Sequence, residues 1–228
     1  MWYKSRSKVE DARYICIEGP IGAGKSTLAK ILAEKTGSRL VTEPDEENPF
    51  LERFYTDERK HAFQTQLFYL LSRYQQQTTL TQGDLFKRGI VCDYLFAKDR
   101  IFAALTLDEQ EFRLYDRVYS LLHAQVPRPD LVIYLQARPD VLLERVRKRG
   151  RKTEARIRSG YLEEVTQAYN QFFFHYAESP LLVVNTSDID FEANAEDRDP
   201  LLKQIARTKS GVHHYIPLGK PSKKDGKS

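Results

Sequence analysis

The chain has 228 residues, of which 41 % are hydrophobic and 30 % charged, and its formal net charge is +4 at pH 7. This length and composition predict one globular domain with a sizeable core and argue against a second full domain. The charge is too small and dispersed to indicate a nucleic-acid partner. No apolar run is long enough to span a membrane, and the first residues lack the apolar stretch of a signal peptide.

The two cysteines, Cys16 and Cys92, each fall inside an apolar stretch. We interpret them as small core residues in a reducing compartment, with no disulfide and no metal role. A cytoplasmic protein without a membrane partner is therefore expected.

Residues 1–12 are polar and charged, and we expect them to be a flexible leader before a first strand at 13–18. A glycine-rich turn and a helix at 26–36 follow that strand. The pattern G-x-x-x-x-G-K-[ST] in this setting is a Walker A phosphate loop, and it predicts binding of ATP with Mg²⁺. Lys25 would spread the phosphate charge and Ser26 would ligate the metal. The expected ATP-binding residues here are Gly19, Pro20, Ile21, Gly22, Ala23, Gly24, Lys25, Ser26 and Thr27.

Strands and helices alternate along the rest of the chain, which predicts an α/β fold. We expect a doubly wound five-stranded parallel sheet with helices on both faces, formed by residues 13–208. From residue 209 onward the chain is basic and contains Pro and Gly, which indicates a disordered tail. His213 and His214 lie in this tail, and we do not expect them to be metal ligands. Further strands are expected at 40–42, 89–93, 127–135 and 181–185, and further helices at 49–55, 59–80, 96–105, 108–124, 139–148 and 161–176.

Two acidic residues follow predicted strands, where a doubly wound sheet places its ligands. Glu43 comes after the second strand and could accept the proton of a hydroxyl that attacks the γ-phosphate, or it could be a solvated loop acid. Asp93 closes the third strand and could hold Mg²⁺ or its water shell, or it could cap a helix.

A basic segment at 149–158 carries Arg149 and Arg151, with Arg145 on the preceding helix. It could be a solvated charge run. Gly150 at its centre favours a lid instead, whose arginines neutralise phosphate charge and exclude water.

On the long helix, Gln66 and Arg73 are seven residues apart and so share one face, where an amide could meet a base edge. An isolated surface Gln is the simpler alternative. The aromatic residues at helical spacing are equally ambiguous between core and binding site; they are Tyr55, Phe63, Phe68 and Phe102.

These features together resemble the deoxynucleoside kinases, over about residues 14–191. The matching segments are IEGPIGAGKST, the TEP after the second strand, ENPFLERFY, FQTQLFYLLSRYQQ, the acid that opens DYLFAKDRIFA, and ERVRKRGRKTE before GYLEEV. The resemblance implies transfer of the γ-phosphate of ATP to the 5′-hydroxyl of a deoxynucleoside, and a homodimer.

By the same resemblance Glu43 is the general base, Tyr55 and Glu154 hold the 3′-hydroxyl, and Gln66 and Arg73 meet the base. Arg149 and Arg151 are lid arginines, and Phe191 sits by the adenine of ATP.

The chain departs from many family members at Asp93-Tyr94, where they carry an acid followed by Arg. Lys98 or Arg100 could replace the missing cation, and either Lys98 or Asp99 could face the base. Asp-Tyr at this point resembles the bacterial purine deoxynucleoside kinases, which favours deoxyadenosine or deoxyguanosine as substrate. Two rival hypotheses are a thymidylate-type nucleoside monophosphate kinase and a nucleotide-binding regulatory switch.

Overall fold

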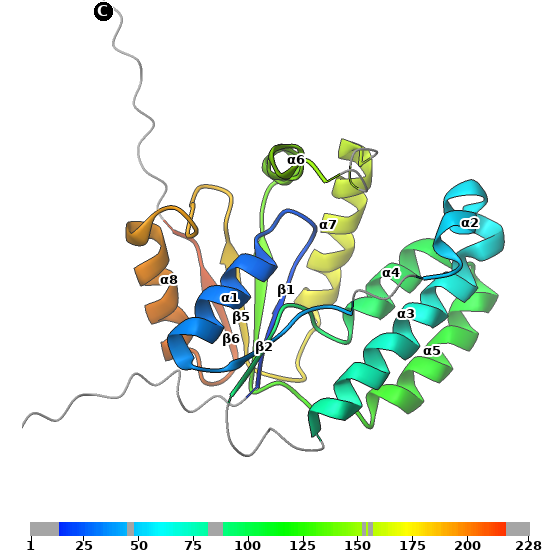
Figure 1. Cartoon of the computed structure of the whole chain (residues 1–228), viewed down its shortest axis with the longest axis horizontal. Coiled ribbons are helices and arrows are strands. Elements are labelled where there is room, and N and C mark those ends of the chain that lie inside the picture. Colours follow the sequence, from blue (N-terminus) through cyan, green and yellow to red (C-terminus); the bar gives the residue numbers. More distant parts are fainter. Residues whose placement is uncertain (1–13, 45–47, 82–88, 152–153, 155–156, 218–228) are drawn as a thin grey trace, which may run out of the picture.

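The computed structural model describes residues 14–44, 48–81, 89–151, 154 and 157–217. Its centre is a six-stranded sheet in the order β2-β3-β1-β4-β5-β6, in which every neighbouring pair is parallel (Figure 1). The strands are β1 (Tyr14–Glu18), β2 (Arg39–Val41), β3 (Ile90–Cys92), β4 (Leu131–Gln136), β5 (Leu181–Asn185) and β6 (Val212–Tyr215).

Helices connect the strands, as a parallel sheet requires. The helices of the described ranges are α1 (Lys25–Thr36), α2 (Leu51–Thr56), α3 (Glu58–Thr81), α4 (Lys98–Thr106), α5 (Glu109–His123), α6 (Pro139–Arg149), α7 (Ser159–Phe174) and α8 (Ala195–Arg207). None of them combines the length and the apolar character that a membrane span needs.

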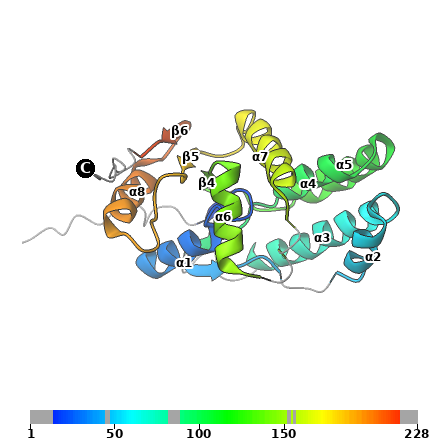
Figure 2. The ribbon, with the colours of Figure 1, turned by 90° about the horizontal axis from the view of Figure 1, so that it is seen from above.

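The central strands are buried on both faces, because each strand sends alternate side chains into two separate cores. Tyr14 and Cys16 of β1 pack in the core that contains α3, α4, α5 and α7. Ile15 and Ile17 pack in the core that contains α1, α6 and α8. Figure 2 shows α3, α4 and α5 on one side of the molecule and α1 and α8 on the other. The prediction of a parallel sheet with helices on both faces is confirmed.

The predicted number of strands is wrong, because a sixth strand lies in the segment expected to be a disordered tail. β6 contains His213 and His214 and pairs with β5 in the register Leu182↔His213 and Val183↔His214. Its side chains are largely exposed, so the strand has little of the apolar alternation that would have revealed it. Residues 218–228 of the expected tail and residues 1–12 of the expected leader lie outside the described ranges.

Helix α8 was also absent from the expected elements. It begins after Asn194, whose side chain accepts a hydrogen bond from the backbone N–H of Glu196, and it buries Leu201, Leu202 and Ile205. The polar start of this segment and Pro200 inside it conceal the helical period.

The strand order decides which loops meet. β2, β3 and β1 are neighbours, so the residues that follow their carboxyl ends lie at one edge of the sheet. Those residues are Glu43, Asp93 and the predicted phosphate loop.

Candidate active site

The predicted phosphate loop joins β1 to α1. Gly19 approaches β4 so closely that a Cβ atom would lie 2.4 Å from the carbonyl oxygen of Leu135, and its φ of +153° is one that residues with a side chain rarely adopt. Helix α1 begins at Lys25, so its N-terminal N–H groups point into the loop, the arrangement that binds phosphate. Lys25 Nζ donates to the carbonyl oxygens of Gly19 at 2.7 Å and Pro20 at 3.3 Å. Burial lowers the pKa of Lys25, which Glu18 partly offsets.

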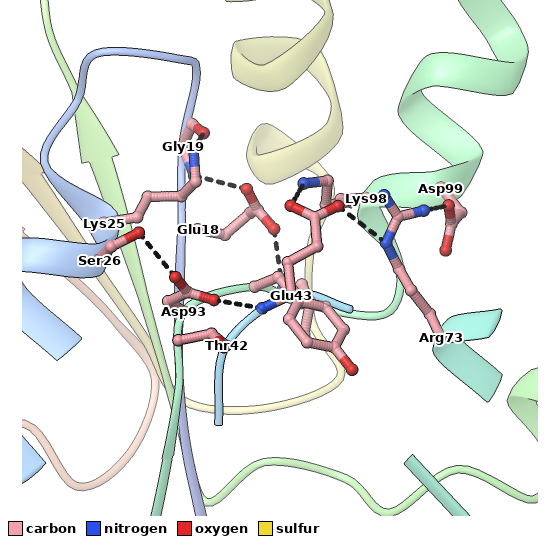
Figure 3. Close-up of polar contacts among 12 residues, drawn as sticks. Glu18, Gly19, Lys25, Ser26, Thr42, Glu43, Arg73, Asp93, Lys98 and Asp99 are labelled. Atoms are coloured by element: carbon pink, nitrogen blue, oxygen red, sulfur yellow. Dashed lines mark hydrogen bonds and ion pairs between the residues drawn. The ribbon is translucent and has the colours of Figure 1, made fainter. Parts of the chain in front are cut away.

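Asp93 links the phosphate loop to Glu43 (Figure 3). Its Oδ2 atom accepts a hydrogen bond of 2.6 Å from the Ser26 hydroxyl, and its Oδ1 atom accepts one of 2.9 Å from the backbone N–H of Glu43. The two residues predicted to organise a metal therefore lie together. Asp93 does not act as the cap of α4, because that helix begins five residues later, at Lys98.

Mg²⁺ binds through oxygen ligands, and in phosphoryl-transfer enzymes it takes one or two carboxylates together with substrate phosphates. The Ser26 hydroxyl and the Asp93 carboxylate are ligands of this kind beside a phosphate loop. Among the described residues, no group of three or more His, Cys, Asp or Glu side chains could hold a metal ion without help. The residues present fit a metal that is held jointly with a bound nucleotide.

Glu43 is held between two cations. Lys98 Nζ donates to Oε2 at 2.8 Å, while Arg73 donates to Oε1 through Nε at 3.1 Å and through a second nitrogen. Burial acts to raise the pKa of Glu43, but Lys98 and Arg73 outweigh it and hold that pKa well below its ordinary range. Glu43 is thus ionised at neutral pH. Its side chain keeps 38 % of its accessible surface, so a substrate can reach it.

Asp99 lies on the other side of Arg73 and pairs with it through Oδ1. Burial raises the pKa of Asp99 to about 6, although Arg73 and Lys98 act against the rise. Its Oδ2 atom is buried and has no hydrogen-bond partner among the described residues. The structure therefore places Lys98 beside Glu43 and Asp99 beside Arg73.

Tyr94 does not face the site. It is fully buried, and its hydroxyl bonds to two glutamines of α3, Gln76 and Gln77. Arg100 pairs at the surface with Asp116. Of the two cations considered as replacements at Tyr94, only Lys98 lies beside Glu43.

Glu18 is a site residue that the motif search missed. Its carboxylate is fully buried at the end of β1. Oε1 accepts from the Gly19 N–H at 2.9 Å and from the Tyr169 hydroxyl at 3.0 Å, and Oε2 accepts from the Leu95 N–H at 2.8 Å. The carboxylate thereby ties the first residue of the phosphate loop to the segment after β3. The sequence signal for Glu18 is an acid at the end of an apolar strand. A carboxylate buried there needs hydrogen-bond donors around it, and this indicates a structured polar site.

The residues predicted to bind a nucleoside lie on α3, α4 and α2. Gln66 is buried and donates to the Thr106 hydroxyl at 3.1 Å. Phe63 and Phe102 are partly buried against the core, and the side chain of Tyr55 lies outside the described part of the structure. A small pocket adjoins Arg73 and is lined by Pro44, Phe68, Tyr69, Ser72 and Arg73.

Of the predicted lid arginines, Arg149 is the last residue of α6 and Arg151 follows the helix. Arg149 donates to both carboxylate oxygens of Glu154, at 3.1 and 2.6 Å, and Arg151 lies 3.8 Å from the same carboxylate. Residues 152–153 and 155–156 lie outside the described ranges. Whether Arg149 and Arg151 close on phosphate, and whether Glu154 meets a 3′-hydroxyl, stay predictions.

Arg145 and Phe191 both contribute to the loop that follows β5. Arg145 donates to the carbonyl oxygens of Thr186 at 2.6 Å and Ile189 at 3.1 Å, and so holds the loop that follows β5. Phe191, in that loop, is buried with its ring against Gly24. A position of Phe191 next to adenine stays a prediction.

A parallel α/β sheet, a Walker A loop with Lys and Ser, and an acid at the end of a neighbouring strand define a P-loop phosphotransferase. The sequence profile described as Deoxynucleoside kinase matches residues 15–209, and the chain belongs to this family. It is accordingly a deoxynucleoside kinase, which confirms the predicted class of enzyme.

Known relatives and solved structures agree with this assignment. The chain is 38 % identical to the Bacillus subtilis deoxyguanosine kinase over 85 % of this chain and 96 % of the relative. It is 30 % identical to the Lactobacillus acidophilus deoxyadenosine kinase over 84 % of this chain and 94 % of that one. The structure of the M. mycoides deoxyadenosine kinase with bound dATP is similar, with a TM-score of 0.69 and 29 % identity, covering 82 % of this chain and 98 % of that chain.

We predict that Glu18→Gln weakens nucleotide binding about tenfold or more and lowers the free energy of unfolding by about 1–3 kcal/mol. Both oxygens of the Glu18 carboxylate accept hydrogen bonds. In the Gln variant an NH₂ group replaces one of these oxygens and faces a donor, which leaves a buried donor without an acceptor. Calorimetric titration with ATP and urea unfolding measure the two effects. Glu34→Gln, on the exposed face of α1, is the matched control. Equal behaviour of the two variants would contradict the prediction.

Proposed function

We propose that the chain transfers the γ-phosphate of ATP, with Mg²⁺, to the 5′-hydroxyl of a purine deoxynucleoside. The observation that carries the proposal is the position of Glu43: its backbone bonds to Asp93, which reaches the phosphate loop, and its carboxylate bonds to Arg73, which reaches the predicted base side. One residue therefore touches both halves of a two-substrate site.

Glu43 suits the role of general base. A carboxylate that Lys98 and Arg73 keep ionised can accept a hydrogen bond from an acceptor hydroxyl and take its proton as the new bond to phosphorus forms. Lys25 neutralises charge on the transferring group, and Lys98 is a second cation on the side of Glu43. Mg²⁺, held by Ser26 and Asp93 with the phosphates, would supply further charge neutralisation. Arg149 and Arg151 would complete the phosphate site when the lid closes.

The base would lie against Arg73, Asp99 and Gln66. Arg73 can donate to acceptor atoms of a base, and Asp99 and the oxygen of Gln66 can accept from a base amino or imino group. This set of donors and acceptors suits a purine edge, and Phe63 and Phe102 offer apolar contact. Tyr55 and Glu154 are the proposed partners of the 3′-hydroxyl. The names of the B. subtilis and L. acidophilus relatives also specify purine deoxynucleosides.

A phosphorylation panel tests this proposal. Purified enzyme with ATP and Mg²⁺ is assayed with the four deoxynucleosides, the corresponding ribonucleosides and the 5′-monophosphates. We expect kcat/KM to be highest for deoxyguanosine or deoxyadenosine, because both present a purine edge to Arg73 and Asp99. A clear preference for a pyrimidine would contradict the purine assignment. Preference for a monophosphate would favour the thymidylate-type hypothesis, and ATP hydrolysis that ignores every nucleoside would favour a regulatory switch.

We also propose that two chains form a homodimer through α3 and α5. These helices pack side by side and leave three leucines exposed, Leu71 on α3 and Leu114 and Leu121 on α5. Sedimentation at micromolar concentration should give twice the mass of one chain, and Leu121→Lys should shift the mass towards one chain. A single-chain mass for the unmodified protein would end this proposal.

The free, buried cysteines are in keeping with a cytoplasmic location.

A further inference from the structure

A chain of hydrogen bonds runs through the core from β1 to the residue before Glu43. The Tyr14 hydroxyl donates to Gln77 Oε1 at 2.8 Å, and Gln77 Nε2 donates to the Tyr94 hydroxyl at 2.8 Å. The Tyr94 hydroxyl donates to Gln76 Oε1, and Gln76 Nε2 donates to the carbonyl oxygen of Thr42 at 3.0 Å. In this series of hydrogen bonds every group donates to the next one along, so each bond orients the group that follows.

The series of hydrogen bonds ends at the peptide bond between Thr42 and Glu43. Gln76 binds the carbonyl oxygen of this peptide, and Asp93 Oδ1 accepts from its N–H at 2.9 Å. Because a peptide unit is planar, holding both of its polar ends fixes the orientation of the whole unit and the starting point of the Glu43 side chain. Figure 3 shows the Asp93 carboxylate bonded to the backbone nitrogen of Glu43.

Helix α3 therefore holds Glu43 at two points one turn apart. Arg73 binds the carboxylate, and Gln76, three residues later on the same helix face, binds the backbone. We propose that Tyr94 is a positioning residue for phosphoryl transfer: its buried hydroxyl orients the Gln76 amide, and Gln76 fixes the Thr42–Glu43 peptide so that the Glu43 carboxylate stays in contact with Arg73 and Lys98. This inference rests on the proposed role of Glu43 as base.

The surroundings of Tyr94 suit a fixed hydroxyl. The residue is fully buried, as is Gln77, while Gln76 is only partly buried. Burial raises the pKa of Tyr94 well above its ordinary value, so the hydroxyl remains a donor over the working pH range. A partly exposed amide such as Gln76 would otherwise rotate freely, and the Tyr94 hydroxyl selects the orientation in which its NH₂ group faces Thr42.

The test compares two conservative variants of the same hydrogen-bond chain. Tyr94→Phe removes the donor to Gln76. Tyr14→Phe also removes one buried hydroxyl bonded to Gln77, but it leaves the bonds from Tyr94 through Gln76 to Thr42 in place. Tyr94→Phe breaks two hydrogen bonds and Tyr14→Phe breaks one, so both variants should have a lower melting temperature, and stability alone does not show whether Glu43 is displaced.

We expect Tyr94→Phe to lower kcat about tenfold, because small displacements of a catalytic group have large effects on rate. The loss should appear in kcat, with the KM for ATP within about twofold of wild type, because the substitution displaces Glu43 and leaves the phosphate loop in place. Tyr14→Phe should stay within about twofold of wild type in both kcat and KM.

Gln76→Met removes the amide and should reproduce the effects of Tyr94→Phe. Because both substitutions break the same connection, the double variant should lose about tenfold in kcat and not a hundredfold. Independent losses that multiply would overturn the inference. So would a Tyr94→Phe enzyme that follows Tyr14→Phe in kcat.

Glu43→Gln in the same assays separates two kinds of failure. If Glu43→Gln loses turnover while Tyr94→Phe behaves like Tyr14→Phe, positioning by Tyr94 is overturned and the role of Glu43 stands. If a folded Glu43→Gln enzyme keeps wild-type turnover, the role of Glu43 as base is overturned, and the positioning inference fails with it.

Discussion

The ion cluster of Glu43, Arg73, Lys98 and Asp99 is the interaction on which the site depends. Two carboxylates and two cations neutralise one another in a largely buried place, where an unpaired charge would be costly. The pKa values of the two acids shift in opposite directions. Glu43 contacts both cations and has a lowered pKa, whereas the more deeply buried Asp99 has a pKa raised to about 6.

These opposite shifts have opposite effects on stability. The lowered pKa of Glu43 stabilises the fold above the ordinary pKa of a glutamate, and this contribution is lost as the pH falls through the lowered value. The raised pKa of Asp99 means that ionising it inside the fold costs free energy, so its effect favours the fold as the pH falls below about 6. The charge on Glu43, the proposed general base, is the more strongly protected of the two.

The parallel sheet and most helices follow from the sequence, because buried β-branched strands and amphipathic helices have strong periodic patterns. The phosphate loop was predictable for the same local reason: its chemistry lies in one continuous segment. β6 was not predictable, since its side chains are mostly exposed and the free energy that orders it comes from pairing with β5. α8 was hidden by a polar start and an internal proline.

The candidate site was predictable in part. Glu43, Asp93 and Arg73 could be named because they follow strands or match a family pattern, but their contacts depend on the order β2-β3-β1, which no local pattern contains. The same holds for Glu18, because two of its three donors, Leu95 and Tyr169, come from distant segments. It holds also for the choice between Lys98 and Asp99, which depends on how α4 packs against α3. Tyr94 looked like a departure from the family at the site, whereas its side chain lies in the core.

Titration of the carboxyl groups by ¹³C NMR would show directly whether Lys98 and Arg73 keep Glu43 charged. With the Glu43 and Asp99 signals assigned by substitution, we predict that Glu43 stays ionised as the pH is lowered through 4.5, the ordinary pKa of a glutamate, while Asp99 titrates near pH 6. Lys98→Met should raise the pKa of Glu43. The contrary result would be a Glu43 carboxyl that titrates at the ordinary pKa of a glutamate, both with and without Lys98. It would show that Lys98 and Arg73 do not hold this side chain as a charged acceptor for the substrate hydroxyl.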